Sequence, residues 1–232
     1  KLSEAVKPGI TTNDLEKLAR ELVLSYGVKG SFLGFDGYPA ILCTSLNDEV
    51  VHAIPSNRVL KEGDLLKIDM GVLHKGFHTD SAITVLVGQN DKVIHTTTRR
   101  VVSSQVLISV TKEALSIGIS KTKAGNTLGD IGAAIQKHVE DKGFNVVRDL
   151  VGHGIGRELH ELPQVLNYGQ AGTGEKLVSG MVIAIEPMVV TGSWKIKNGK
   201  DGYAFVTKDG GLAAHFEHTV AITDAGPLVL TK

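Results

Sequence analysis

Four acidic residues lie within apolar stretches of this sequence, where an uncompensated charge is costly. Two of them, Asp69 and Asp80, belong to the segment LLKIDMGVLHKGFHTDSAITV, which is typical of two strands joined by a tight turn. Their midpoint falls between His74 and Lys75, so a two- or four-residue loop there would place the carboxylates directly opposite each other, unless a bulge at Gly76 breaks the pairing. Two carboxylates about 4 Å apart repel by about 4 kcal/mol at an effective dielectric near 20. They therefore need a shared proton or a cation between them.

A salt bridge is the competing explanation for Asp69, because Lys67 lies two positions away on the same face of the strand. A second strand weakens this alternative. The segment LKEGDLLKIDMGV resembles LVSGMVIAIEPMV, in which Glu186 takes the place of Asp69 and Ala184 takes the place of Lys67. A pseudo-twofold axis would bring both acids to one centre.

The same duplication is visible in two amphipathic segments, PGITTNDLEKLARELVLSYG (8–27) and AGNTLGDIGAAIQKHVEDKG (124–143). In each, a threonine stands three residues before an aspartate, which predicts a capping box at the start of a helix. Gly27 and Gly143 are the expected C-terminal stops. A weaker match sets HAIP, with His52, on HELP, with His160.

Two further segments contribute polar residues that could do chemistry. VGHGIGRELHELPQV holds His153 and His160, and its glycines argue against a helix at its start. A phosphate-binding loop at GHGIG would need a following Lys-Ser/Thr, which is absent. AAHFEHTVAIT places Glu217 in an otherwise apolar strand, where an exposed edge position is the alternative.

Charge counting connects the four acids. One divalent cation among Asp69, Asp80, Glu186 and Glu217 would leave two negative charges, and two cations would leave none. Oxygen donors with one imidazole suit Mn, Fe, Co or Zn in a site with open positions. Two such metals about 3.5–4 Å apart could acidify a bridging water.

The elements that must position these residues form one fused unit, because no linker or low-complexity segment interrupts the chain. We expect a single catalytic domain over 1–232, with pseudo-repeat halves at about 1–97 and 98–232. Strands are expected at 65–72, 81–87, 181–190 and 218–222. A helix is expected over 98–117, and its candidate core positions are Val101, Val102, Val106, Leu107 and Val110. The first copy lacks a counterpart of this helix, so we expect about one helix upstream of Lys1.

Composition excludes several classes of protein. The 25 basic and 25 acidic residues cancel, which gives no broad electrostatic basis for nucleic-acid or membrane binding. The single cysteine cannot form an internal disulfide and fits a reducing compartment. No apolar run approaches the ~18 residues of a membrane span, and the first residues lack a secretory h-region. We expect a cytoplasmic monomer.

Five motifs in a fixed order carry a family resemblance: GYPAILCTSLNDEVVHAIP, GDLLKIDMGVLHKGFHTDSA, GHGIGRELHELPQV, GMVIAIEPM and FEHTVAIT. With them the sequence resembles the type I methionine aminopeptidases over essentially its whole length. The resemblance implies the α+β pita-bread fold, with two pseudo-twofold αβ halves around a curved, mostly antiparallel sheet. It also implies removal of the initiator methionine from nascent chains with a small second residue, with the ribosome as a candidate place of encounter.

The resemblance assigns roles as well. His52 would contact the substrate backbone, His160 would stabilise the developing oxyanion, and Glu186 would pass a proton to the leaving amine. Two divalent ions would polarise the carbonyl and supply the attacking hydroxide. The implied metal ligands are Asp69, Asp80, His153, Glu186 and Glu217.

The substrate pocket departs from the family pattern. The segment FDGYP has Phe35 and Asp36 where the family often has Tyr and His. Leu159 stands where an aromatic residue is common, and Tyr203 stands where the family often has Trp. An apolar slot for a thioether is still expected, and ordinary core packing is the alternative for each of its residues. The expected pocket residues are Phe35, Tyr38, Cys43, Leu159 and Tyr203.

Two alternatives remain open at this stage. One is an Xaa-Pro aminopeptidase or prolidase of the same fold, although those enzymes usually carry a large extra N-terminal domain. The other is a non-catalytic peptide-binding relative, which would typically have lost metal ligands, whereas all five positions are present here.

Overall fold

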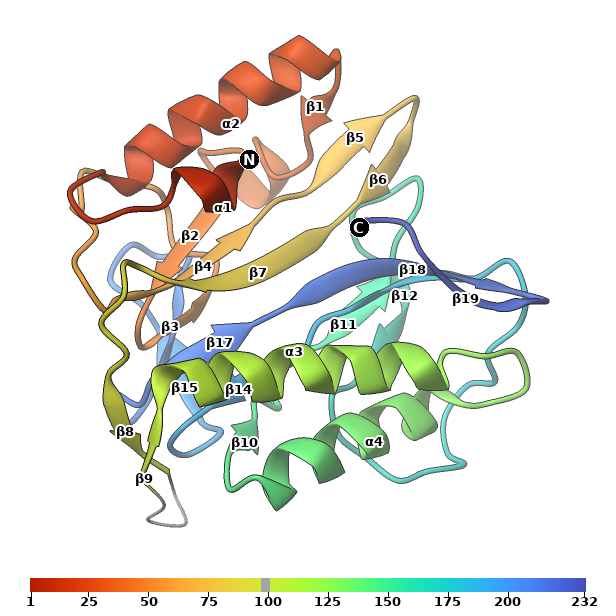
Figure 1. The fold of residues 1–232 in the computed structure, drawn as a ribbon. Coiled ribbons are helices and arrows are strands. Elements are labelled where there is room, and N and C mark those ends of the chain that lie inside the picture. Colours follow the sequence, from red (N-terminus) through yellow and green to blue (C-terminus); the bar gives the residue numbers. More distant parts are fainter. Residues whose placement is uncertain (97–100) are drawn as a thin grey trace.

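The structure is a computed structural model that describes residues 1–96 and 101–232 (Figure 1). Its helices are α1 (Leu2–Ala5), α2 (Thr12–Tyr26), α3 (Ser104–Lys121) and α4 (Leu128–Asp141), with a 3₁₀ turn, η1, at Phe35–Gly37. The strands of the first part are β1 (Lys29–Gly30), β2 (Cys43–Leu46), β3 (Glu49–Val51), β4 (Leu65–Asp69), β5 (Val72–His74), β6 (Phe77–Thr79), β7 (Ser81–Leu86) and β8 (Val93–His95). The later strands are β9 (Val101–Ser103), β10 (Asn145–Val146), β11 (Gly152–Gly154), β12 (Glu161–Val165), β13 (Val182–Ile185), β14 (Met188–Val190), β15 (Ile196–Asn198), β16 (Phe205–Thr207), β17 (Ala213–His215), β18 (Glu217–Thr223) and β19 (Gly226–Val229).

One antiparallel sheet organises the molecule. Its strands run in the order β12-β11-β13-β18-β7-β4-β2, and β19 pairs with β18. Helix α3 packs against the central strands β7, β18 and β13, with α4 beside it, and α2 lies on the side of β2 and β4 (Figure 1). This arrangement of helices around an antiparallel sheet confirms the expected α+β class.

The pairing pattern of the sheet repeats on either side of its centre. β4 lies between β2 and β7, and β13 lies between β11 and β18. The two sets join where β7 pairs with β18, through Ala82 opposite Glu217 and Ser81 opposite His218. On the other edge of β7, Ala82 pairs with Asp69. The carboxylates of Asp69 and Glu217 therefore come from strands on either side of one small residue. The division of the chain near residue 97 stays a prediction.

Both predicted capping boxes are present. The backbone N–H of Thr11 donates to Oδ2 of Asp14 at 2.7 Å, and that of Thr127 donates to Oδ2 of Asp130 at 2.8 Å. The threonine hydroxyls accept the reciprocal hydrogen bonds from the aspartate N–H groups. Gly27 ends α2 with φ 66°, in the left-handed region that favours glycine.

The prediction of a helix over 98–117 was wrong at its start. Residues 98–100 lie outside the described residues, as does the side chain of Val102, and 101–103 form strand β9 against β8. Helix α3 begins only at Ser104, because the preceding residues have an antiparallel partner instead. This phase turns Val106 outward, while Leu107 and Val110 are buried as expected and Val101 is exposed.

Two expected strands are also divided. The stretch 65–72 ends as β4 at Asp69, and 181–190 separates into β13 and β14 around Glu186 and Pro187. Proline lacks the N–H that a continuous ladder would require, so the strand breaks at the acid. The break releases Glu186 from the sheet on the side of the site.

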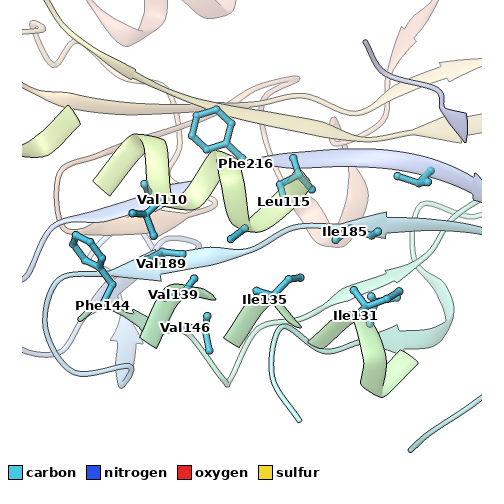
Figure 2. Close-up of a cluster of buried hydrophobic side chains, with 14 of the residues drawn as sticks. Val110, Leu115, Ile131, Ile135, Val139, Phe144, Val146, Ile185, Val189 and Phe216 are labelled. Carbon is cyan, nitrogen blue, oxygen red and sulfur yellow. The ribbon is translucent and has the colours of Figure 1, made fainter. Parts of the chain in front are cut away.

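The largest apolar core lies between the two long helices and the sheet (Figure 2). Val110 and Leu115 of α3 and Ile135 of α4 pack against Ile185 and Val189. A second core holds α2 against β2 and β4. In the described residues, no helix is long and apolar enough to cross a membrane.

We expect the two capping boxes to contribute similarly to stability. Thr11→Ala and Thr127→Ala should each lower the free energy of unfolding by about 1 kcal/mol, because each removes the hydroxyl that accepts from a first-turn N–H, that of Asp14 or Asp130. Urea denaturation measures this. The control Ser116→Ala, on the exposed face of α3, should change it by less than about 0.5 kcal/mol. A cap variant as stable as the control would contradict the capping role.

Candidate metal centre

The hairpin that carries two of the acids differs in register from the expectation. Its turn is Lys75-Gly76, with His74 paired to Phe77, and both turn residues have positive φ, 51° and 82°. Such a turn matches the twist of the strands, and it centres the hairpin one residue later than expected. The prediction that Asp69 and Asp80 are directly opposite was therefore wrong.

The two aspartates are nevertheless close. Asp69 pairs with Ala82, and the side chain of Ala82 shares its face with that of Asp80, two residues earlier. The two carboxylates are therefore diagonal neighbours, within reach of each other. Each perturbs the pKa of the other.

The competing salt bridge is not formed. Lys67 is only 1% exposed, and its Nζ donates to the carbonyl oxygen of Asn47 at 2.9 Å. None of the ion pairs within 1–96 and 101–232 joins it to Asp69. Burial lowers the pKa of Lys67 to about 7. This ammonium does not compensate the charge of Asp69 by direct contact.

All four acids from apolar stretches line one cavity. Burial is the largest cause that raises the pKa of each, and their mutual repulsion contributes to the raised pKa of Asp69, Glu186 and Glu217. The pKa of Asp80 rises to about 7. Oδ1 of Asp69 and Oε1 of Glu217 are buried and have no hydrogen-bond partner. Buried carboxylate oxygens without a hydrogen-bond partner are stabilised by binding a cation or a proton.

His153 has the ring orientation that a metal ligand needs. Its Nδ1 lies 2.9 Å from the carbonyl oxygen of Gly154, which can only accept, so Nδ1 carries the proton and Nε2 keeps its lone pair. That Nε2 lies 3.5 Å from Oε1 of Glu186. One possible ligand atom each from His153, Asp80 and Glu217 lie within 4.8 Å of one another. Carboxylate oxygens with one free imidazole nitrogen fit a divalent cation.

The two other predicted histidines stand at the same cavity. The centroid of the His160 ring lies 4.4 Å from that of the His153 ring and 4.9 Å from that of the Phe35 ring. His52 has a φ of 63°, an uncommon conformation for a residue with a side chain. Burial lowers the pKa of His52 to about 4 and also lowers that of His160. Both rings are therefore neutral near pH 7, and each can donate one hydrogen bond.

The predicted pocket residues all border this cavity of about 310 Å³. The hydroxyl of Tyr38 points away into the protein, to the carbonyl oxygens of Leu42 at 2.9 Å and Ala53 at 3.1 Å. The hydroxyl of Tyr203 donates to the carbonyl oxygen of Gly37 at 2.8 Å. Because both hydroxyls are engaged elsewhere, the rings offer apolar surface. The walls also include residues that were not predicted as pocket residues: Phe32, Asp36, Gly202 and Phe205.

Sequence reasoning missed one polar residue at the site. His215 is 1% exposed, and its Nε2 lies 3.6 Å from Oε2 of Glu186. Burial lowers its pKa to about 3. The available signal was its place two residues before Glu217, since alternate residues of an extended segment share a face.

Comparison with known proteins agrees with this geometry. The model of metallopeptidase family M24 matches residues 1–224. The chain therefore belongs to this family of metal-dependent peptidases. Within the family it groups with the methionine aminopeptidases: that of Clostridium acetobutylicum is 48% identical over 231 residues, which are 99% of this chain and 88% of the relative.

Solved structures lead to the same group. The crystal structure of a methionine aminopeptidase from Thermotoga maritima superposes with a TM-score of 0.92 at 44% identity, covering 100% of this chain and 89% of that one. The expected pita-bread fold is thereby confirmed. A prolidase from Pyrococcus furiosus has a TM-score of 0.74 at 21% identity, covering 58% of that chain, and it shares the fold alone.

We expect Asp80→Asn to have opposite effects on the metal-free and metal-loaded protein. The pKa of Asp80 is raised on folding, so its contribution to stability is complete below about pH 4 and is lost as the pH rises through about 7. At pH 8 with EDTA, the variant should be more stable than the wild type by at least about 1 kcal/mol, and the difference should shrink at pH 5.5.

With Mn²⁺ at about 100 times its Kd, the wild type should gain about 2.7 kcal/mol and the variant far less. Urea denaturation with EDTA at pH 8 and pH 5.5, and with Mn²⁺ at pH 8, measures both effects. Asp224→Asn, at an exposed turn, is the control and should follow the wild type. If Asp80→Asn gained the full stabilisation from Mn²⁺, Asp80 would not be a ligand.

Proposed function

We propose that this protein removes the N-terminal methionine from nascent chains whose second residue is small. The observation that carries the proposal is an apolar slot directly beside the acid cluster. Phe32, Tyr38, Cys43 and Leu159 form one buried apolar group, and Tyr203 packs against it. The same residues border the cavity that holds the acids. An unbranched, polarizable methionine side chain suits such a slot.

The metal ligands in this proposal are Asp69, Asp80, His153, Glu186 and Glu217. Four carboxylates balance two divalent ions, for which Co, Mn, Fe and Zn are the candidates. When bound, the ions would supply Lewis acidity and an acidified water. The protein's own contribution is a buried, preorganised set of donors that loses little freedom when it binds them.

Glu186 is the proposed proton carrier. Its carboxylate lies between two imidazoles, His153 on one oxygen and His215 on the other. Burial and the charge of Asp80 raise its pKa, so the group holds a proton more readily than an exposed glutamate. A carboxyl group with a raised pKa is suited to accept a proton from water and deliver it to the departing amine.

The neutral histidines would position the substrate. His160 would donate a hydrogen bond to the carbonyl oxygen as negative charge develops on it, and His52 would contact the peptide backbone. Neutral rings suit this role because they add no fixed positive charge beside the cations. The free α-amine of the substrate would lie beside the acid cluster, which restricts cleavage to the terminal residue.

The setting follows from the substrate. Initiator methionine is carried by chains emerging during synthesis, so we propose that the protein acts in the cytoplasm and meets its substrates at the ribosome. We also propose that it acts as a monomer. The proline-directed alternative rests on the shared fold alone.

Peptide hydrolysis tests the proposal. The Mn²⁺-loaded protein should cleave Met-Ala-Ser and leave Xaa-Pro peptides intact, because the slot fits a single apolar side chain. Released amino acids are measured by chromatography. Glu186→Gln, which removes the proton carrier, should abolish turnover while the circular dichroism spectrum stays unchanged. Cleavage of Xaa-Pro peptides alone would refute the proposal.

A second measurement addresses the oxyanion. His160→Ala should lower kcat on Met-Ala-Ser by about 10²–10³, the usual effect of losing one donor to a developing negative charge. His74→Ala serves as the matched control, since that imidazole is exposed on β5. An unchanged kcat for His160→Ala would remove His160 from this role.

A further inference from the structure

A buried imidazole outside the predicted set of ligands is held rigidly by its backbone. His215 ends β17, where it pairs with Met188 of β14. Its N–H donates to Oγ1 of Thr84 at 2.8 Å, and the Thr84 hydroxyl donates to its carbonyl oxygen at 2.7 Å. Thr84 is itself buried in β7. The direction in which the ring leaves the strand is therefore fixed by two neighbouring strands.

The ring of His215 has no hydrogen-bond partner at either nitrogen, although both nitrogens are buried. A neutral imidazole carries one N–H, and leaving it unpaired in the interior costs free energy. Oε2 of Glu186, 3.6 Å from Nε2, is an acceptor in front of it. The distance lies just beyond a hydrogen bond, so a shift of roughly half an ångström closes it.

The carboxylate of Glu186 has different neighbours on its two oxygens. Oε1 faces Nε2 of His153, 3.5 Å away, whereas Oε2 faces His215. His153 keeps a lone pair on that nitrogen because its Nδ1 is bonded to Gly154. Oε1 therefore lies on the side of the candidate metal ligands, and Oε2 lies on the side of a possible hydrogen-bond donor.

We propose that His215 is a positioning residue for Glu186: its Nε2–H donates to Oε2 and fixes the carboxylate so that Oε1 faces the metal centre. The assignment rests on the proposed function in one respect, that Glu186 is a metal ligand. A carboxylate already held in its ligating orientation loses less freedom when it binds a cation. Partners of this kind typically change metal affinity by about 10–100-fold.

Three substitutions at position 215 separate this role from simple packing. The side-chain nitrogen of Gln reaches about as far as Nε2 of His, whereas that of Asn reaches only as far as Nδ1. His215→Gln should therefore keep the donor at Glu186. His215→Asn should keep a polar side chain without reaching the acceptor, and His215→Leu should remove the donor.

The readout is the affinity of the metal-free protein for Mn²⁺, measured by isothermal titration calorimetry without substrate. We expect His215→Asn and His215→Leu to bind Mn²⁺ roughly 10–100-fold more weakly and His215→Gln to bind within about threefold of the wild type. His218→Gln is the matched control on the neighbouring strand, where that ring contacts Thr231, and it should leave the affinity unchanged. Wild-type affinity in His215→Asn, or equal loss in His215→Gln, would overturn the proposal.

A measurement on the unmodified sequence keeps the test decisive if a variant does not fold. In a long-range ¹H–¹⁵N spectrum of the metal-free protein, His215 should show the tautomer protonated at Nε2. The opposite tautomer would overturn the proposal. Both readouts are independent of peptide cleavage, so a wild type that binds Mn²⁺ but leaves Met-Ala-Ser intact would refute the proposed function and leave the role of His215 standing.

Discussion

The whole structure is organised around the mutual repulsion of four buried carboxylates. Burial raises the pKa of all four, and repulsion from neighbouring carboxylates adds to the rise for Asp69, Glu186 and Glu217. A protein would be more stable with apolar residues at these positions, because buried charges are costly to desolvate. Apolar cores elsewhere in the molecule stabilise the fold that holds these acids together. Several destabilising buried acids gathered in one cavity are typical of a functional site.

Repetition of one αβ pattern explains how distant acids reach the same point. Asp69 ends β4 and Glu186 follows β13, strands with equivalent places in the sheet. Each strand is followed by an interruption, at the hairpin in one case and at Pro187 in the other. Interruptions of this kind free side chains from the regular pleat and allow two of them to face a common ligand. His52 follows β3, His160 precedes β12 and His153 is the middle residue of β11, and all three line the same cavity.

Much of the site was predictable because strand faces and helix caps are local properties. Thr11 and Thr127 cap their helices as their spacing indicated, and all the predicted metal and pocket residues border one cavity. The register of the hairpin was not predictable to one residue, because it depends on Lys75 accepting a positive φ. The start of α3 depended on a strand pairing that the apolar pattern of 101–110 does not reveal.

His215 escaped notice for a related reason, since its importance lies in what it faces rather than in its neighbours along the chain. The position of Glu217 along the chain affects when the centre can assemble. Glu217 opens β18, which lies between β7 and β13 in the sheet, so it joins the other acids through pairings on both sides. During synthesis the centre cannot be completed until β18 has emerged and has paired with β7 and β13. A copy that stops before Glu217 therefore lacks one of the proposed metal ligands, so the order of the strands sets when the centre can form.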